Sequence, residues 1–255
     1  MSQLEADAFD FSNKIVLVTG GSRGIGAGLV EAFGTRGARC VVNYVADKDG
    51  RNKADAERVA AGLKDAVVIE CDVADDRRVA DMMQQMRDTL GGLDILINNA
   101  GILRDRTIKN MTLDDWEAVM RVNLTGPFNC IRQAMPILRT GGRIVNISSL
   151  SAVAGIFGQS NYASAKAGVI ALSKVAAREL ARQQVTVNAI APGVVETEII
   201  QSVPEEQKKR FLDQIPLGRF GQVADVVNAA LFLCSPMAQY ITGQVIHVNG
   251  GSLMP

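Results

Sequence analysis

Residues 14–26 read KIVLVTGGSRGIG. The first half is a run of apolar, mostly β-branched residues, and the second half is a turn with glycines at positions 20, 24 and 26. A buried strand that runs into a glycine turn and then an amphipathic segment is typical of a strand-to-helix unit. The glycines also let a phosphate group approach the backbone where the helix begins. This stretch therefore predicts the first unit of a parallel sheet.

Runs of the same kind recur along the chain and alternate with segments of helical apolar spacing. The apolar runs are KIVLVTG (14–20), ARCVVNY (38–44), DAVVIECD (65–72), LDILINNAG (93–101), GRIVNISS (142–149), VTVNAIAPG (185–193) and QVIHVNGG (244–251). The expected helices span 26–36, 52–63, 75–90, 113–138, 161–182 and 223–234. This alternation predicts a doubly wound α/β fold, a parallel seven-stranded sheet with helices on both faces.

No linker, repeat or low-complexity segment divides the chain. We expect a loose N-terminal tail over residues 1–12 and a single domain over 13–255. Residues 194–221 follow the sixth strand and predict a lid over the carboxyl edge of the sheet. Its apolar residues would contact a substrate; they are Ile199, Ile200, Phe211, Leu212 and Ile215.

Composition excludes several classes of protein. Lys plus Arg and Asp plus Glu each total 27, and no basic run exceeds Lys208-Lys209-Arg210, so nucleic-acid binding is not expected. No apolar run is long enough to span a membrane, and the acidic start is unlike a signal peptide, which predicts a cytoplasmic protein. The cysteines lie far apart and the one histidine, His247, lies in a strand pattern, so neither a disulfide nor a metal site is expected.

Residues 161–168 read NYASAKAG and place a phenol, Tyr162, one helical turn before an ammonium, Lys166. Most such pairs lie on solvated helix faces. The energy of the pair can nevertheless be compared with what catalysis needs: shifting a tyrosine pKa from about 10 to neutrality requires roughly 4 kcal/mol. A cation about 4 Å away supplies about that amount at an effective dielectric constant of about 20. The pair therefore predicts a tyrosine that exchanges a proton near neutral pH.

The fifth apolar run ends in Ser148-Ser149, thirteen residues before Tyr162. The carboxyl ends of parallel strands form one edge of a sheet, and ligands bind at that edge. We therefore expect the serine pair and Tyr162 to meet there. With a single histidine in the chain, a serine-hydrolase interpretation of Ser149 is weak.

Four motifs together resemble those of the short-chain dehydrogenase/reductase family: the spacing G-x-x-x-G-x-G, NNAG (98–101), NISS (146–149) and NYASAK. The likeness covers nearly the whole chain beyond residue 12 and implies a Rossmann-type domain. It implies that Ser149 binds a substrate carbonyl oxygen, that Tyr162 is the general acid, and that Lys166 also grips the nicotinamide ribose.

The resemblance assigns two more residues near these groups. Ser148 is expected to be structural, because Ser149 has the family spacing. Asn123, in RVNLTGPF, matches a helix asparagine that helps to hold a water leading from the lysine to solvent. The alternative is that Asn123 marks an irregular helix.

The resemblance also implies a bound nicotinamide dinucleotide. Asp72 and Val73 match the pair beside the adenine, Asn99 lies under the cofactor, and Val195 and Thr197 clamp the carboxamide. The expected cofactor-binding set is Gly20, Ser22, Arg23, Gly24, Ile25, Gly26, Asp72, Val73, Asn99, Tyr162, Lys166, Val195 and Thr197.

The second apolar run bears on the choice between NAD and NADPH. It ends in Asn43-Tyr44 without the carboxylate that would bind a ribose 2′-hydroxyl, and Arg23 supplies a cation for a 2′-phosphate. We therefore expect NADPH. Asp47 would favour NAD if the strand ran longer.

The runs GILRDRTIKNMT (101–112) and QIPLGRFGQ (214–222) look most like those of 3-oxoacyl thioester reductases, which act on acyl-carrier-protein or coenzyme A substrates. The positions that match two carrier-docking arginines read Thr140 and Gln183, with Arg139 and Arg182 one residue away. A sugar or polyol dehydrogenase and a non-catalytic dinucleotide sensor are the alternatives. By the same resemblance we expect a homotetramer joined through the fourth and fifth helices and the last strand.

Overall fold

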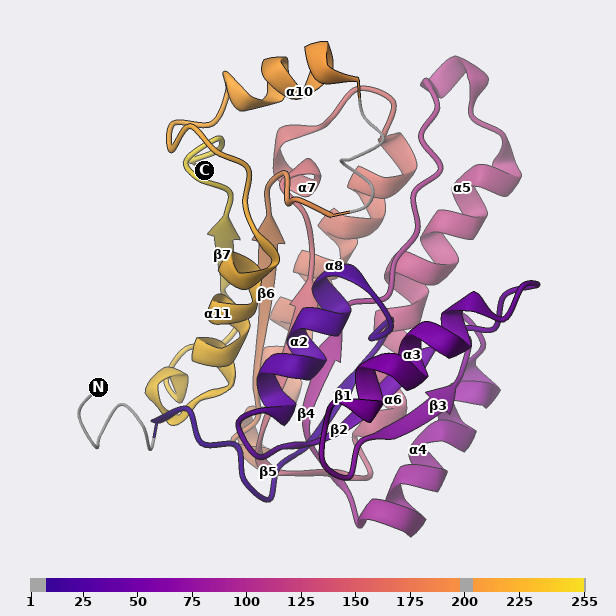
Figure 1. Ribbon diagram of the computed structural model, residues 1–255, viewed down its shortest axis with the longest axis vertical. Coiled ribbons are helices and arrows are strands. Elements are labelled where there is room, and N and C mark those ends of the chain that lie inside the picture. The colour runs from indigo at the N-terminus through magenta and orange to yellow at the C-terminus, as the bar shows by residue number, and fades with distance from the viewer. Residues whose placement is uncertain (1–7, 198–203, 255) are drawn as a thin grey trace.

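The computed structural model describes residues 8–197 and 204–254. Its strands form one parallel sheet in the order β3-β2-β1-β4-β5-β6-β7 (Figure 1). They span Ile15–Val18 (β1), Arg39–Tyr44 (β2), Val67–Glu70 (β3), Leu93–Asn98 (β4), Leu138–Ile147 (β5), Thr186–Pro192 (β6) and Val245–Val248 (β7). The predicted doubly wound fold with a seven-stranded parallel sheet is confirmed.

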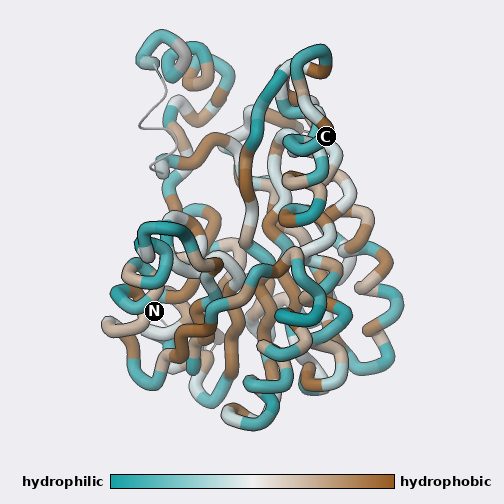
Figure 2. The backbone as a smooth tube through the Cα atoms, turned by 90° about the vertical axis from the view of Figure 1, so that its right-hand side faces the viewer, coloured by the Kyte–Doolittle hydropathy of each residue, from teal (hydrophilic) through white to brown (hydrophobic). Residues whose placement is uncertain are grey.

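Helices cover both faces of the sheet. One face packs against α2 (Gly24–Gly34), α3 (Arg51–Ala61) and α11 (Val223–Cys234), and the other against α4 (Asp76–Leu90), α6 (Gly126–Ala134) and α8 (Ser160–Glu179). In β1, Val16 and Val18 join the first core and Leu17 joins the second, because side chains alternate across a strand. Figure 2 shows the apolar segments running through the middle of the body, with polar residues outside.

The expected helix over 113–138 is wrong in its end, and it is irregular around Asn123, as the alternative interpretation of that residue predicted. The chain forms α5 (Leu113–Met120), a π-helical turn over Arg121–Thr125, and then α6. Leu138 belongs to β5 and pairs with Leu93 of β4. Because a π turn holds one residue more than an α turn, it shifts the helix face locally, and apolar spacing alone cannot locate it.

The expected loose tail is wrong where the structure describes it. Phe11 is 2% exposed, and its ring meets that of Phe33 edge-on with centroids 4.8 Å apart. Phe9 also packs against the core on the α2 face. Aromatic burial of this kind attaches the segment to the body of the protein.

The carboxyl edge of the sheet carries the short helix α7 (Ser151–Ala154) and, above β6 and β7, the lid helix α10 (Glu205–Leu212) (Figure 1). Strand order reverses between β1 and β4, so the loops that follow these strands diverge and leave a crevice for a ligand. Ile199 and Ile200, expected in the lid, lie outside the described residues. Among the helices that the structure describes, none has the length and apolar character needed to cross a membrane.

Candidate active site

The loop between β1 and α2 forms a cradle of backbone at this crevice. Gly20 and Gly24 have φ of +62° and +54°, which residues with side chains rarely adopt. A Cβ on Gly26 would lie 2.1 Å from the carbonyl oxygen of Gly20, so only glycine fits there. Backbone thus approaches the N-terminus of α2 without side chains in the way, an arrangement that suits a pyrophosphate.

Two asparagine side chains hold the cradle in place. Asn99 donates from Nδ2 to the carbonyl oxygens of Thr19 and Gly20, at 2.9 and 3.1 Å. Asn43 accepts from the N–H of Gly20 at 3.2 Å and donates to the carbonyl of Cys71 at 3.0 Å. Asn99 therefore lies against the predicted cofactor loop. Asn43, which the sequence marked only as uncharged, ties that loop to β2 and β3.

The Arg23 side chain extends from the glycine loop toward the start of α3. Its Nη2 atom donates to Asn52 Oδ1 and lies 3.7 Å from Asp55 Oδ2, and the side chain is 45% exposed. Strand β2 ends at Tyr44, and Asp47 accepts from the backbone N–H of Asn52 at 2.9 Å. The strand therefore ends where the sequence predicted, and Asp47 stabilises the start of α3.

The remaining residues of the predicted cofactor set line the same edge. Asp72 Oδ1 accepts from the N–H of Ala74 at 2.9 Å, and Val73 is 5% exposed. The Val73 carbonyl accepts from Asn129 Nδ2 at 3.0 Å, which fixes the turn after β3 against α6. Ser22 is half-buried in the glycine loop, and Ile25 packs on the α2 core.

Tyr162 and Lys166 lie on the first turns of α8, and Ser149 follows the end of β5. Lys166 Nζ lies 5.7 Å from the centroid of the Tyr162 ring and donates to the carbonyl of Ile147 at 2.7 Å. Ser149 lies close enough to Tyr162 that hydrogen bonding between the two side chains lowers the pKa of the phenol. The structure thus brings together the phenol, the ammonium and the serine hydroxyl that the sequence predicted.

Asn123 completes this group from the π turn. Its side chain is fully buried and holds both backbone groups of Ile102, accepting from the N–H at 2.8 Å and donating to the carbonyl at 3.0 Å. A Cβ on Gly101 would lie 3.5 Å from Asn123 Oδ1 and 3.6 Å from Lys166 Nζ. Asn123 and Lys166 therefore approach the same glycine from two sides.

The electrostatics differ from the sequence-based expectation that Lys166 lowers the pKa of Tyr162. Burial raises the pKa of the Tyr162 phenol; the hydrogen bond with Ser149 opposes this shift and the charge of Asp105 adds to it. Burial also lowers the pKa of Lys166 to about 8. Desolvation dominates because both side chains are largely removed from water. Tyr162 is consequently protonated at neutral pH.

The segment after β6 crosses the front of the glycine loop. Val195 is 7% exposed, and its neighbours pair with Gly221: Gly221 N–H donates to Val194 O at 2.9 Å and Glu196 N–H to Gly221 O at 2.8 Å. The Thr197 methyl lies 3.8 Å from the Cβ position of Gly24. Thr197 thus faces the cofactor loop, as a clamp requires.

In the described part of the lid, Ile215 does not face a substrate space. It is 6% exposed and lies against Gly250, where a Cβ would be 2.7 Å from Ile215 Cγ2. Ile215 therefore packs inward against the turn after β7, which does not favour the expected substrate contact. Phe211 and Leu212 remain half-buried on α10.

Two buried residues next to the catalytic candidates anchor α8. Ser148 Oγ donates to the Lys166 carbonyl at 2.9 Å, which confirms its structural role. Asn161 is fully buried; it donates to the carbonyls of Arg104 and Asp115 at 3.0 and 3.2 Å and accepts from the N–H of Tyr162 at 2.7 Å. The sequence analysis missed Asn161, and its position directly before Tyr162 was the available signal.

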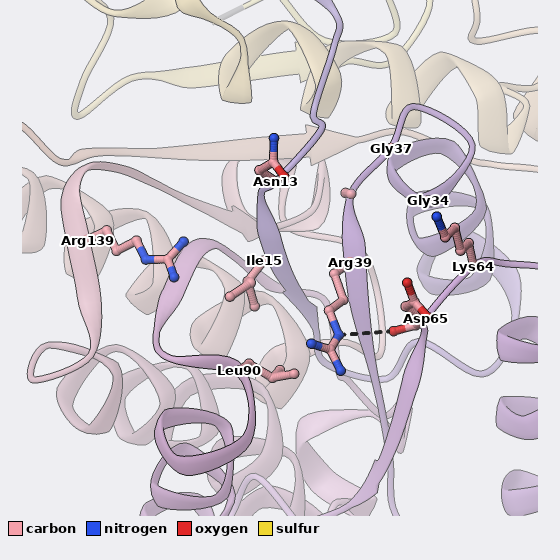
Figure 3. Close-up of a pocket in the computed structure, with 10 residues that line it drawn as sticks. Asn13, Ile15, Gly34, Gly37, Arg39, Lys64, Asp65, Leu90 and Arg139 are labelled. Carbon is pink, nitrogen blue, oxygen red and sulfur yellow. Dashed lines mark hydrogen bonds between the residues drawn. The ribbon is translucent and has the colours of Figure 1, made fainter.

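A separate pocket of about 410 Å³ lies at the amino edge of the sheet (Figure 3). Ile15 and Arg39, the first residues of β1 and β2, line it together with Leu90 and Arg139. Arg39 donates to the Asp65 carbonyl at 3.3 Å, and Arg139 pairs with Asp94 at 2.8 Å. No candidate catalytic or cofactor residue lines this pocket, so it is distinct from the site at the carboxyl edge.

Comparisons with known proteins identify the family of the chain. The model of the family described as "Enoyl-(Acyl carrier protein) reductase" matches residues 20–252. The chain is 44% identical over 243 residues to the 3-oxoacyl-[acyl-carrier-protein] reductase FabG of Staphylococcus aureus strain N315, covering 94% of this chain and 98% of the relative. The FabG protein of Aquifex aeolicus is 44% identical over 244 residues, covering 93% and 96%.

Two solved structures are similar throughout. A Brucella melitensis protein described as "Short-chain dehydrogenase/reductase SDR:Glucose/ribitol dehydrogenase" has a TM-score of 0.90 at 30% identity, covering 97% of this chain and 99% of that one. A mutant short-chain dehydrogenase/reductase of Serratia marcescens has a TM-score of 0.87 at 32% identity, covering 95% and 99%.

Proposed function

Because the chain belongs to the short-chain dehydrogenase/reductase family and is an NAD(P)-dependent oxidoreductase, we propose that it reduces a 3-oxoacyl thioester to the 3-hydroxyacyl thioester with NADPH. One observation carries this proposal: Ser149, Tyr162, Lys166 and Asn123 converge beside the glycine loop. The names of the similar FabG proteins support the thioester substrate.

In the proposed reaction the glycine loop and Lys166 would hold NADPH, which would supply the hydride for the carbonyl carbon. The Tyr162 phenol gives its proton to the carbonyl oxygen, so the C=O bond becomes a CH–OH group. Ser149 donates a hydrogen bond to that oxygen as negative charge develops on it. The raised pKa of Tyr162 suits this direction, because a proton donor must be protonated at working pH.

Lys166 and Asn123 are proposed to serve the proton supply. The lysine ammonium is buried beneath Tyr162 and would also hold the nicotinamide ribose. The Asn123 side chain bonds to both backbone groups of Ile102, and we propose that a water between the lysine and solvent binds the main chain of the π turn. A π turn frees backbone carbonyl groups for this purpose.

The preference for NADPH rests on charge at the end of β2. Arg23 places a half-exposed guanidinium there, 3.7 Å from Asp55 Oδ2 of α3, and β2 itself ends without a carboxylate. Asp47, the acid that would favour NAD, lies beyond the strand and accepts from the N–H of Asn52. A 2′-phosphate would therefore meet a guanidinium, its preferred partner.

The acyl carrier is proposed to be either a carrier protein or coenzyme A. Arg139, one residue from a predicted docking position, pairs with Asp94 at the amino edge. On α10, Lys208 and Arg210 pair with Glu205 and Glu206 at 2.7 Å each. These ion pairs partly neutralise the basic segment and reduce its attraction for phosphates.

A sugar or polyol dehydrogenase is the second candidate, because the similar Brucella melitensis protein is described as a glucose/ribitol dehydrogenase. The decisive measurement is NADPH consumption with acetoacetyl-CoA, an acetoacetyl carrier protein and a panel of sugars. Thioester turnover supports the proposal, and NAD-linked turnover confined to sugars supports the second candidate. Cofactor binding without turnover of any carbonyl compound would indicate a dinucleotide sensor.

We further propose a cytoplasmic homotetramer. Large apolar side chains lie exposed on the expected contact surfaces: Phe128 of α6 is 46% exposed, Val175 of α8 51%, and Met237 and Tyr240, just before β7, 61% and 100%. β7 is the edge strand of the sheet and its residues are only half-buried. A second copy of the chain would cover these surfaces. Light scattering tests this assembly.

A further inference from the structure

Gln159, three residues before Tyr162, connects two loops at the carboxyl edge. Its Nε2 atom donates to Asp105 Oδ2 at 2.8 Å, and its Oε1 atom accepts from Ser151 Oγ at 2.7 Å. Beside it, the N–H of Arg106 donates to the carbonyl of Gly158 at 2.9 Å. The loop that follows β4 is therefore joined to the loop that precedes α8 by hydrogen bonds from both side chains and backbone.

The chemistry of Asp105 fixes the direction of this chain of hydrogen bonds. An ionised carboxylate only accepts, so the NH₂ group of Gln159 must face Asp105 and its carbonyl must face Ser151. The hydroxyl of Ser151 is then obliged to donate to Gln159. One charge at the loop surface thereby sets the orientation of two neutral side chains.

The chain continues to the candidate catalytic serine. Ser151 is 7% exposed and opens α7, and its backbone N–H donates to Ser149 Oγ at 3.1 Å. That bond occupies an acceptor position on Ser149, so the hydroxyl hydrogen is left to point elsewhere. Its other partner is Tyr162, at the place where the substrate oxygen would lie.

We propose that Gln159 is a positioning residue: by holding Ser151 it keeps α7 in the place where Ser149 presents its hydroxyl as a donor to the substrate oxygen. Asp105 orients Gln159 for this task. The inference rests on the proposed reductase function and deepens it, since it identifies what orients one of the two groups that would contact the carbonyl oxygen.

The first test compares Gln159→Leu, Ser151→Ala and the double variant in acetoacetyl-CoA reduction. Displacement of a catalytic hydroxyl costs on the order of 10- to 100-fold in rate, so each single variant should lower kcat by about that factor. KM for NADPH should stay unchanged, because neither side chain faces the glycine loop. The double variant should be no worse than the worse single variant, because both changes break one chain.

Gln84→Leu is the matched control. Gln84 Nε2 donates to Asp88 at 2.8 Å on the exposed side of α4, which reproduces the Gln–Asp contact away from the site. This variant should keep the wild-type kcat. Melting temperatures of all variants show whether a loss of activity reflects unfolding.

A charge exchange provides the rescue. Gln159→Glu places a second carboxylate against that of Asp105, and the repulsion between them should lower kcat. Adding Asp105→Asn to that variant restores a donor toward the introduced carboxylate, whose second oxygen still accepts from Ser151. The protein that carries both Asp105→Asn and Gln159→Glu should recover most of the lost kcat.

The outcomes separate the two proposals. If the wild type reduces the thioester but Gln159→Leu changes only the substrate KM, or if the losses of Gln159→Leu and Ser151→Ala multiply, the positioning role is wrong and the function stands. Failure of the charge exchange to restore kcat in a folded protein also refutes the role. A wild type inactive with every carbonyl compound overturns the function, and this role with it.

Discussion

The ammonium of Lys166 lies 5.7 Å from the centroid of the Tyr162 ring and donates to the carbonyl of Ile147 at 2.7 Å. Both side chains are largely removed from water, and this burial raises the pKa of the phenol and lowers that of the lysine to about 8. The lysine therefore acts on a tyrosine that is protonated at neutral pH, which is the state that a proton donor needs for carbonyl reduction.

Tyr162→Phe should remove nearly all reductase activity and leave NADPH affinity largely intact. The variant lacks only the hydroxyl, and the glycine cradle is held by Asn43 and Asn99, which the change does not touch. Steady-state assays with acetoacetyl-CoA measure the reductase activity, and fluorescence titration with NADPH measures the cofactor affinity. An active Phe variant would contradict the proton-donor assignment.

The buried Lys166 should make stability depend on pH. Its pKa falls from 10.5 in the unfolded chain to about 8 in the folded one, so between these values the unfolded state binds more protons and stability rises with pH. Relative to Lys166→Met, the wild-type free energy of unfolding should gain about 1 kcal/mol per pH unit in this window.

Urea unfolding of both proteins from pH 8 to pH 10.5, without cofactor, measures this difference. The buried thiols of Cys40 and Cys71, whose pKa values are raised to about 12, act in the opposite direction above pH 9. They are present in both proteins and cancel. A difference that stays flat across the window would show that Lys166 is not desolvated.

Arg23→Ala should raise KM for NADPH by about tenfold and leave KM for NADH nearly unchanged, because a charge-assisted hydrogen bond to phosphate contributes about 1.5 kcal/mol or more. The control is Arg58→Ala. Arg58 also pairs with Asp55, but it lies in the last turn of α3 and not in the glycine loop. Steady-state kinetics with both cofactors test the prediction. Equal effects on the two cofactors would refute the phosphate assignment.

Gly26→Ala should abolish cofactor binding, because the new Cβ would lie 2.1 Å from the Gly20 carbonyl oxygen and force the cradle apart. Gly62→Ala, at the end of α3, is the matched control: its Cβ would meet nothing closer than 3.8 Å. NADPH titration and thermal melting distinguish the two variants. Normal binding by the Gly26 variant would mean that the cradle is not the cofactor site.

The sequence by itself determined the sheet, its parallel direction and the edge at which the candidate site forms. These features depend on local patterns: apolar runs of strand length, glycines that permit positive φ, and the spacing of Tyr162 and Lys166 on one helix face. Even the predicted end of β2 at Tyr44 agrees with the structure.

Only the tertiary structure decided how that site works. Periodicity could not reveal the π turn around Asn123, because its compensating hydrogen bonds go to Ile102, twenty-one residues away along the chain. Nor could it show that desolvation outweighs the lysine charge at Tyr162, or that Gln159 reaches both Asp105 and Ser151. Burial and long-range hydrogen bonds depend on which segments the fold brings together, and no single stretch of sequence contains that information.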